Sequence, residues 1–149
     1  MPRITRKAAI VWDGNLARGS GHISAASGAF ADLAFSLATR IAQKAGSTSP
    51  EELLAGAHGA CFTMSLAGEL TAAGTPPTHL EVSCEIVMDE VEGAGHQIVG
   101  SNLEARATVE RIDEAAFADV ARRADEECPF SALLKRSGAQ VTLDARLVP

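Results

Sequence analysis

The sequence predicts an α+β fold, in which strands with one buried face combine with a long helix. Apolar and polar residues alternate over residues 80–109, as expected of a half-buried antiparallel hairpin. A helix-start signal precedes a long apolar stretch at residues 49–74. Strands and helices follow one another in separate runs, which favours antiparallel sheets over βαβ winding. The length of 149 residues fits one domain, residues 1–149.

The N-terminal part is predicted to form a hairpin. From Ile4 to Trp12, apolar residues alternate with polar ones, which indicates a strand. Turn residues follow at positions 13–15, and residues 17–25 are again extended in character. Residues 28–40 are apolar without clean alternation or a clear helix cap, and we expect an irregular strand there.

The long helix has the clearest start signal in the chain. Ser49 can cap it, Pro50 suits its first position, and Glu52 completes a capping box. The helix is expected to run to Gly74, where two prolines stop it. Its Ala and Gly content and its apolar residues on several sides are typical of a helix packed in the middle of a structure.

The remaining elements follow in order after the hairpin of residues 80–109. Asp113 is expected to cap a helix that runs to Glu127. Cys128 precedes a proline, which disfavours the helical conformation at Cys128 and suits the first position of a new helix over residues 129–137. A last strand is expected over residues 141–147.

Composition excludes several functions. The net charge of −6 and a sequence pI near 5.2 argue against nucleic acid as a partner, because neutralising phosphate requires clustered Lys and Arg. No stretch is long and apolar enough to span a bilayer, and the N-terminus lacks the apolar core of a signal peptide. We therefore expect a soluble cytoplasmic protein without a membrane partner.

Three cysteines without a signal peptide suggest redox or catalytic thiols rather than structural disulfides. Cys84 falls on the apolar side of a strand, where a thiol packs as a small hydrophobic group. Cys128 sits at a helix N-terminus, which favours thiolate. Cys61 lies in the middle of a helix and needs a cation, from Arg18 or Arg40, to become reactive. The residues alone thus favour Cys128 as the more reactive thiol.

A metal or phosphate site is not expected. The four histidines, at positions 22, 58, 79 and 96, lack ligand spacing, and neither Cys61 nor Cys128 has a C-x-x-C partner. The glycines of residues 14–21 lack the Lys-Ser/Thr of a phosphate-binding loop, so a hairpin turn is the better interpretation.

Two motifs nevertheless resemble a known family. The segment Thr48-Ser-Pro-Glu-Glu-Leu-Leu-Ala-Gly-Ala-His-Gly-Ala-Cys-Phe62 is similar to the first active-site motif of the OsmC/Ohr family, the osmotically inducible and organic hydroperoxide resistance proteins. Cys128-Pro-Phe-Ser131 resembles the second cysteine motif of that family. The spacing and the order of elements fit over the whole chain. His58 and residues 17–21 look more like the OsmC branch than the Ohr branch.

The resemblance implies an intertwined homodimer, with antiparallel sheets wrapped around central helices and each active site at the subunit interface. It implies that Cys61 is the peroxidatic cysteine and Cys128 the resolving one, which reverses the ranking made from the residues alone. Glu51 matches the acidic residue that orients a catalytic arginine. Arg40 best fits that arginine, and Arg18 competes with it.

The activity implied by the resemblance is a cysteine-based peroxidase. Cys61 would reduce an organic hydroperoxide to an alcohol, form a sulfenic acid, and then a disulfide with Cys128. An external thiol, in the family often a lipoylated protein, would restore both cysteines, and no haem, flavin or metal is required. The alternative is a non-catalytic dimer of the same fold that senses redox state or binds an apolar ligand.

Overall fold

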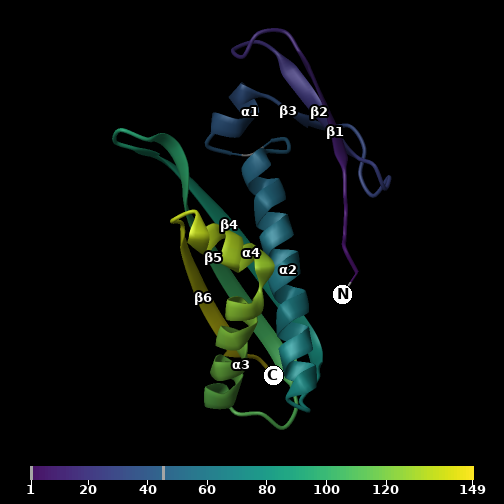
Figure 1. Ribbon diagram of the computed structural model, residues 1–149, viewed down its shortest axis with the longest axis vertical. Coiled ribbons are helices and arrows are strands. Elements are labelled where there is room, and N and C mark those ends of the chain that lie inside the picture. The colour runs from purple at the N-terminus through teal and green to yellow at the C-terminus, as the bar shows by residue number, and fades with distance from the viewer. Residues whose placement is uncertain (1, 45) are drawn as a thin grey trace. The chain divides into compact units, whose positions relative to one another are not determined.

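A computed structural model describes residues 2–44 and 46–149, so Met1 and Ala45 of the expected domain lie outside the described residues. The chain divides into two compact units, residues 1–53 and 54–149. The elements, labelled in Figure 1, are β1 Ala8–Asp13, β2 Ser20–Ala25, β3 Leu33–Phe35, α1 Leu37–Ile41, α2 Pro50–Ala72, β4 Pro77–Val91, β5 Gly95–Val109, α3 Glu114–Glu127, α4 Pro129–Arg136 and β6 Gln140–Leu147.

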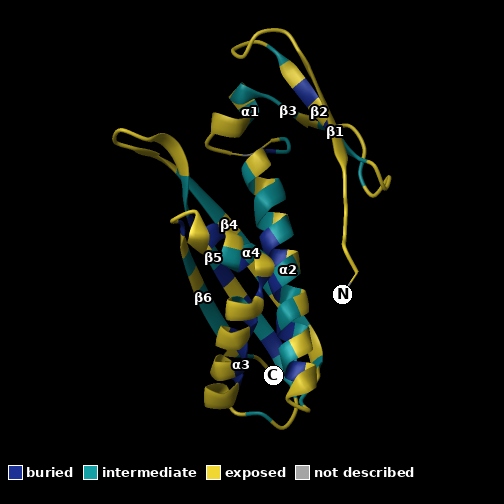
Figure 2. Ribbon diagram, in the orientation of Figure 1, coloured by how far each residue is buried: buried dark blue, intermediate teal, exposed yellow. Residues whose placement is uncertain are grey.

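The first unit contains a small antiparallel sheet with the strand order β1-β2-β3. Ile10 of β1 pairs with Ile23 of β2, which confirms the predicted N-terminal hairpin. The first strand begins at Ala8 rather than at Ile4. Every residue of β1 is exposed in the chain (Figure 2). Trp12 itself is 37% exposed.

The expectation of one irregular strand over residues 28–40 is wrong. Only β3 is extended there, and the short helix α1 follows it. The physical reason is a capping box: the Ser36 side chain accepts from the backbone N–H of Thr39, and the Thr39 hydroxyl accepts from that of Ser36. This box starts a helix whose last turn carries Arg40.

The long helix α2 confirms the prediction made from its start signal. The Ser49 hydroxyl accepts a hydrogen bond of 3.2 Å from the backbone N–H of Glu52. The helix ends at Ala72, and Gly74 follows with a φ of +78°, a left-handed conformation that glycine adopts without strain. The Ser49 cap belongs to the first unit, and the helix continues through the second.

The second unit is built on a sheet with the strand order β4-β5-β6. β4 and β5 form the predicted antiparallel hairpin, and α3 begins after the Asp113 cap as predicted. The expectation of purely antiparallel sheets is wrong at one place, because β6 runs parallel to β5. The helices α3 and α4 supply the long crossover that a parallel pair requires.

The core of the second unit lies between this sheet and the helices on one of its faces. Alternate residues of β5 point into it, and Ala105 and Ala107 are small enough for helices to approach closely. Gly59 serves the same purpose on α2, since a Cβ there would lie 3.2 Å from the Cβ of Cys84. Other members of this core, which include the buried aromatic side chains, are Phe62, Leu66, Leu70, Leu103, Phe117, Val120, Ala121, Ala124 and Cys128.

Candidate active site

The second unit brings Cys61 and Cys128 together. Cys61 lies on α2, three turns after its start, and Cys128 separates α3 from α4. Pro129 explains this break, because proline disfavours the helical conformation at the preceding residue, and Cys128 has φ −70° and ψ 117°. All three cysteines of the chain are free thiols, and Cys128 lies close enough to Cys61 to raise the pKa of the Cys61 thiol.

The surroundings of Cys61 within the chain do not activate it. Its pKa is raised, first by burial and then by the neighbouring Cys128, while the backbone N–H of Phe130 lowers it. Cys128 itself is fully buried. Burial favours the neutral thiol, so Cys61 needs a positive charge to become an effective nucleophile at neutral pH.

The first unit holds the second group of predicted residues, Arg40 and Glu51. The Nε of Arg40 donates to both carboxylate oxygens of Glu51, at 3.0 and 3.1 Å, and its Nη2 donates to Oε1. Glu51 is in the first turn of α2, and Arg40 holds the pKa of its carboxyl below the ordinary value. This fork of hydrogen bonds fixes the orientation of the guanidinium plane.

The two candidate arginines differ in their surroundings. Arg18 lies in the turn between β1 and β2, where its backbone N–H donates to Oδ1 of Asn15 at 3.0 Å. The carboxylate of Glu51 pairs with Arg40. Within the first unit, the predicted partnership of an oriented arginine with Glu51 is therefore found at Arg40.

A small apolar hollow of 90 Å³ lies beside Arg40 in the first unit. The rings of Trp12 and Phe35 form part of its wall, with their centroids 5.5 Å apart. The other residues that line it are Leu16, Ser36, Leu37 and Pro50. Arg40 thus lines a surface that can accommodate a hydrocarbon group.

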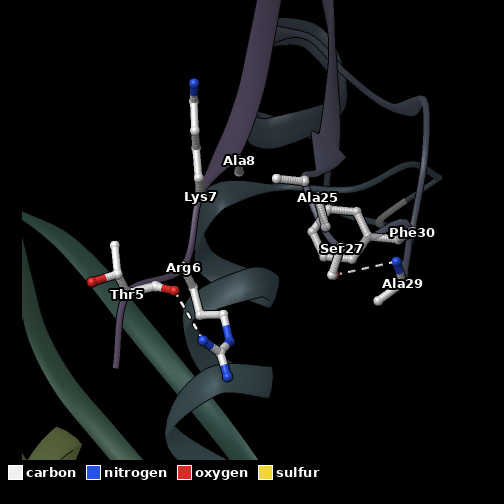
Figure 3. Close-up of a pocket in the computed structure, with 9 residues that line it drawn as sticks. Thr5, Arg6, Lys7, Ala8, Ala25, Ser27, Ala29 and Phe30 are labelled. Carbon is white, nitrogen blue, oxygen red and sulfur yellow. Dashed lines mark hydrogen bonds between the residues drawn. The ribbon is translucent and has the colours of Figure 1, made fainter. Parts of the chain in front are cut away.

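A larger open hollow of 840 Å³ also lies in the first unit (Figure 3). Arg6 and Lys7 lie on one side of it, and Phe30 and Ser27 on the other (Figure 3). None of its lining residues is a cysteine, a histidine or an acidic residue. It therefore lacks the groups that thiol or acid-base chemistry needs.

His58, three residues before Cys61 on α2, is a fully buried polar side chain. Its Nδ1 lies 2.7 Å from the Ser101 hydroxyl and its Nε2 lies 2.7 Å from the Ser131 hydroxyl. All three residues are fully buried, and burial lowers the pKa of His58, so the ring is neutral near pH 7. The sulfur of Cys84 lies 3.4 Å from the Ser101 hydroxyl and packs against the core, the position predicted for it.

The comparisons with known proteins agree with this geometry. The family described as OsmC-like protein matches residues 43–144. The chain is 35% identical to "Peroxiredoxin OsmC" of Escherichia coli (strain K12) over 144 residues, 97% of this chain and 97% of that protein. The chain belongs to the OsmC family. The resemblance found in the sequence is therefore confirmed.

Solved structures related to the OsmC family share the fold. A structure of an organic hydroperoxide resistance protein OsmC from Legionella pneumophila has a TM-score of 0.78 at 20% identity, covering 97% of this chain and 98% of that one. The OhrB protein of Bacillus subtilis has a TM-score of 0.73 at 23% identity, covering 94% and 98%. At these identities the likeness establishes the fold, which is the α+β class predicted.

Two observations apply to residues 2–44 and 46–149. No cluster of three or more His, Cys, Asp and Glu side chains is arranged to hold a metal ion there. In the same residues, no helix combines the length and the apolar character needed to cross a bilayer.

The role of His58 as a hydrogen-bonded link was not predicted from the sequence. The histidines were considered only as metal ligands, for which their spacing is unsuitable. Two features of the sequence could have indicated such a buried hydrogen bond. One is a histidine about one turn before Cys61 on an apolar helix, and the other is a serine at position 101 in an alternating strand. A buried polar residue of either kind requires a partner.

Proposed function

We propose that this protein is a thiol peroxidase that reduces organic hydroperoxides through Cys61 and Cys128. The observation that carries the proposal is the pair of free thiols in the second unit, which lie close enough for Cys128 to raise the pKa of Cys61. The relative from Escherichia coli that is 35% identical is named a peroxiredoxin, which supports the same reaction class.

In the first step, the thiolate of Cys61 attacks the distal oxygen of the hydroperoxide. A sulfur–oxygen bond forms and the O–O bond breaks, so the sulfur is oxidised and the peroxide is reduced. The leaving alkoxide takes a proton and departs as the alcohol. Cys61 is left as a sulfenic acid.

In the second step, the thiol of Cys128 attacks the sulfur of the Cys61 sulfenic acid. A disulfide forms, and the hydroxyl group leaves with a proton as water. A dithiol, which we propose to be a lipoylated protein, then reduces the disulfide by thiol–disulfide exchange and is itself oxidised to a disulfide. The cycle uses no cofactor. Free thiols of this kind fit a reducing compartment, and we propose the cytoplasm.

We propose that Arg40, oriented by Glu51, supplies the positive charge for Cys61 in a homodimer. Glu51 and Cys61 lie ten residues apart on α2, about 15 Å along the helix axis at 1.5 Å per residue. An arginine held on the first turn is too far along this helix to touch a thiol three turns later. A second protomer is the natural source of the charge.

The preference for organic hydroperoxides is supported by the hollow beside Arg40. Its aromatic and aliphatic lining offers a hydrocarbon group an apolar surface, which hydrogen peroxide cannot use. Arg40 lines the same hollow, and a guanidinium can donate hydrogen bonds to peroxide oxygens. The two features together fit a substrate with an apolar body and a hydroperoxide end.

The experiment compares consumption of cumene hydroperoxide and hydrogen peroxide by the purified protein with a dithiol present. The proposal predicts catalytic turnover, faster with cumene hydroperoxide, and none with the Cys61→Ser variant. Turnover that is absent from the native protein would support the alternative of a non-catalytic sensor or ligand-binding dimer, and equal turnover in the variant would contradict the role of Cys61.

A further inference from the structure

The buried ring of His58 connects three elements of the second unit. The ring projects from α2, its Nδ1 is bonded to Ser101 on β5, and its Nε2 is bonded to Ser131 in the first turn of α4. All three residues are fully buried, so solvent cannot readily replace a hydrogen bond that is lost. A neutral imidazole can satisfy both hydroxyls at once, because one nitrogen donates and the other accepts.

The position of this link relative to the two cysteines is specific. His58 lies three residues before Cys61, and Ser131 lies three residues after Cys128. Residues three apart on a helix are neighbours on its surface. The bond from His58 to Ser131 therefore joins the same two segments that carry Cys61 and Cys128, about one helical turn from each thiol.

Besides core packing, an ion pair between Lys135 on α4 and Asp125 on α3 also spans the junction at Cys128, and it lies beyond the first turn of α4. Cys128 occupies the N-cap position of α4, but its side chain makes no capping hydrogen bond. Pro129 occupies the first helical position, where its ring fixes φ but leaves no backbone N–H to donate a hydrogen bond. The Ser131 hydroxyl is thus a side-chain anchor of this turn, and its partner is the residue one turn from Cys61.

We propose that His58 is a positioning residue for disulfide formation, which holds the first turn of α4 so that Cys128 stays within reach of Cys61. This inference rests on the proposed function for its biological meaning. The geometric requirement is independent of it, since a disulfide needs Cα atoms about 4.4 to 6.8 Å apart and correctly directed side chains. His58 touches neither peroxide nor the reacting atoms in this role.

The test measures how well the two thiols are positioned, without any peroxide. The full-length protein is equilibrated with reduced and oxidised glutathione, all variants carry Cys84→Ala, and the fraction with a Cys61 to Cys128 disulfide is measured. One oxidised glutathione takes two electrons and two protons from the thiol pair and becomes two reduced glutathione molecules. The equilibrium constant is the effective concentration of one thiol at the other.

Two variants remove the link and one keeps part of it. His58→Phe and Ser131→Ala should each lower the effective concentration about ten-fold, which is about 30 mV in the reduction potential of the pair. His58→Gln should retain more of it than His58→Phe, because an amide can still bond Ser131. Ser131→Ala is a small change that keeps the test informative if His58→Phe does not fold.

The matched control is Leu70→Ala, a fully buried position further along α2. This substitution loosens the core at a position away from the first turn of α4. The effective concentration of one thiol at the other should therefore stay within about two-fold of the reference protein. An unchanged value in both His58→Phe and Ser131→Ala, or an equal loss in Leu70→Ala, would show that His58 only fills the core.

A second readout uses excess cumene hydroperoxide. Poor positioning should leave the Cys61 sulfenic acid to react with more peroxide and become sulfinic acid, so His58→Phe should accumulate sulfinate at the expense of the disulfide. An unchanged partition between sulfinate and disulfide would count against the role of His58. If the peroxide oxidised Cys61 in no variant, the proposed function would fail, while the glutathione equilibrium would still decide the role of His58.

Discussion

Replacing Arg40 by alanine should raise the pKa of Cys61 and slow its reaction with peroxide. Burial and the neighbouring Cys128 already raise the pKa of this thiol within the chain. An ordinary thiol with a pKa of about 8.5 is only about 3% ionised at pH 7. The backbone N–H of Phe130 does not offset this rise, so a positive charge beside the sulfur must supply most of the activation. The carboxylate of Glu51 holds Arg40 in a fixed orientation.

The size of the effect follows from the electrostatics. A full charge about 4 Å from the thiolate stabilises it by about 4 kcal/mol at an effective dielectric constant of about 20, which is about three pKa units. The Arg40 side chain is 37% exposed in the chain, so solvent screens part of this interaction. We expect a rise of about one to three units in the pKa of Cys61 and attack on peroxide slower by about ten-fold or more.

The assay is the rate of Cys61 alkylation as a function of pH, in a protein that carries Cys84→Ala and Cys128→Ser so that one thiol remains. Removing Cys128 changes the surroundings of Cys61 equally in every variant, so the comparison remains valid. Arg18→Ala is the matched control and should have the milder effect. The reasoning is refuted if Arg40→Ala leaves the profile unmoved, and a shift in Arg18→Ala alone would assign the role to Arg18.

Three further predictions concern the remaining residues. Cys61→Ser should abolish turnover, whereas Cys128→Ser should let Cys61 oxidise once and then stall or over-oxidise. Mass spectrometry measures the oxidation of each variant in a single turnover, and equal oxidation in both would contradict these roles. Cys84→Ala should keep turnover within a few-fold and cost at most stability, and finding Cys84 in the disulfide of the oxidised protein would overturn this. Arg40 lowers the pKa of Glu51, so the stability that their bond contributes is present above the ordinary pKa of about 4.3 and is lost as pH falls through the lowered value. The difference in thermal unfolding midpoint between the native protein and Glu51→Gln should therefore shrink below about pH 4, and a constant difference would argue against it.

Local signals in the sequence were sufficient for most elements. Ser49, Pro50 and Glu52 start α2 as predicted, because capping depends on neighbouring residues alone. The helix α1 was missed because its capping residues, Ser36 and Thr39, stand between apolar residues that also suit a strand. The direction of β6 was missed because alternation defines a buried face but not which way a strand runs.

Some residues of the candidate site were named from the sequence, but the contacts between them were not. These contacts join residues that are far apart along the chain. Cys61 and Cys128 are 67 residues apart, and no local pattern shows that they meet. Their roles came from the resemblance to the family. The residues alone favoured Cys128, because the preference for thiolate at a helix N-terminus is visible in a sequence and a charge brought from elsewhere is not. The bond between His58 and Ser131 joins residues 73 apart and was equally invisible.

The most direct test of the central claim is peptide mapping after one equivalent of cumene hydroperoxide has reacted with the reduced protein. The proposal predicts one cumyl alcohol released per protomer, a disulfide between Cys61 and Cys128, and a free thiol at Cys84. Unreacted peroxide with all three thiols intact, or a disulfide that includes Cys84, would contradict it.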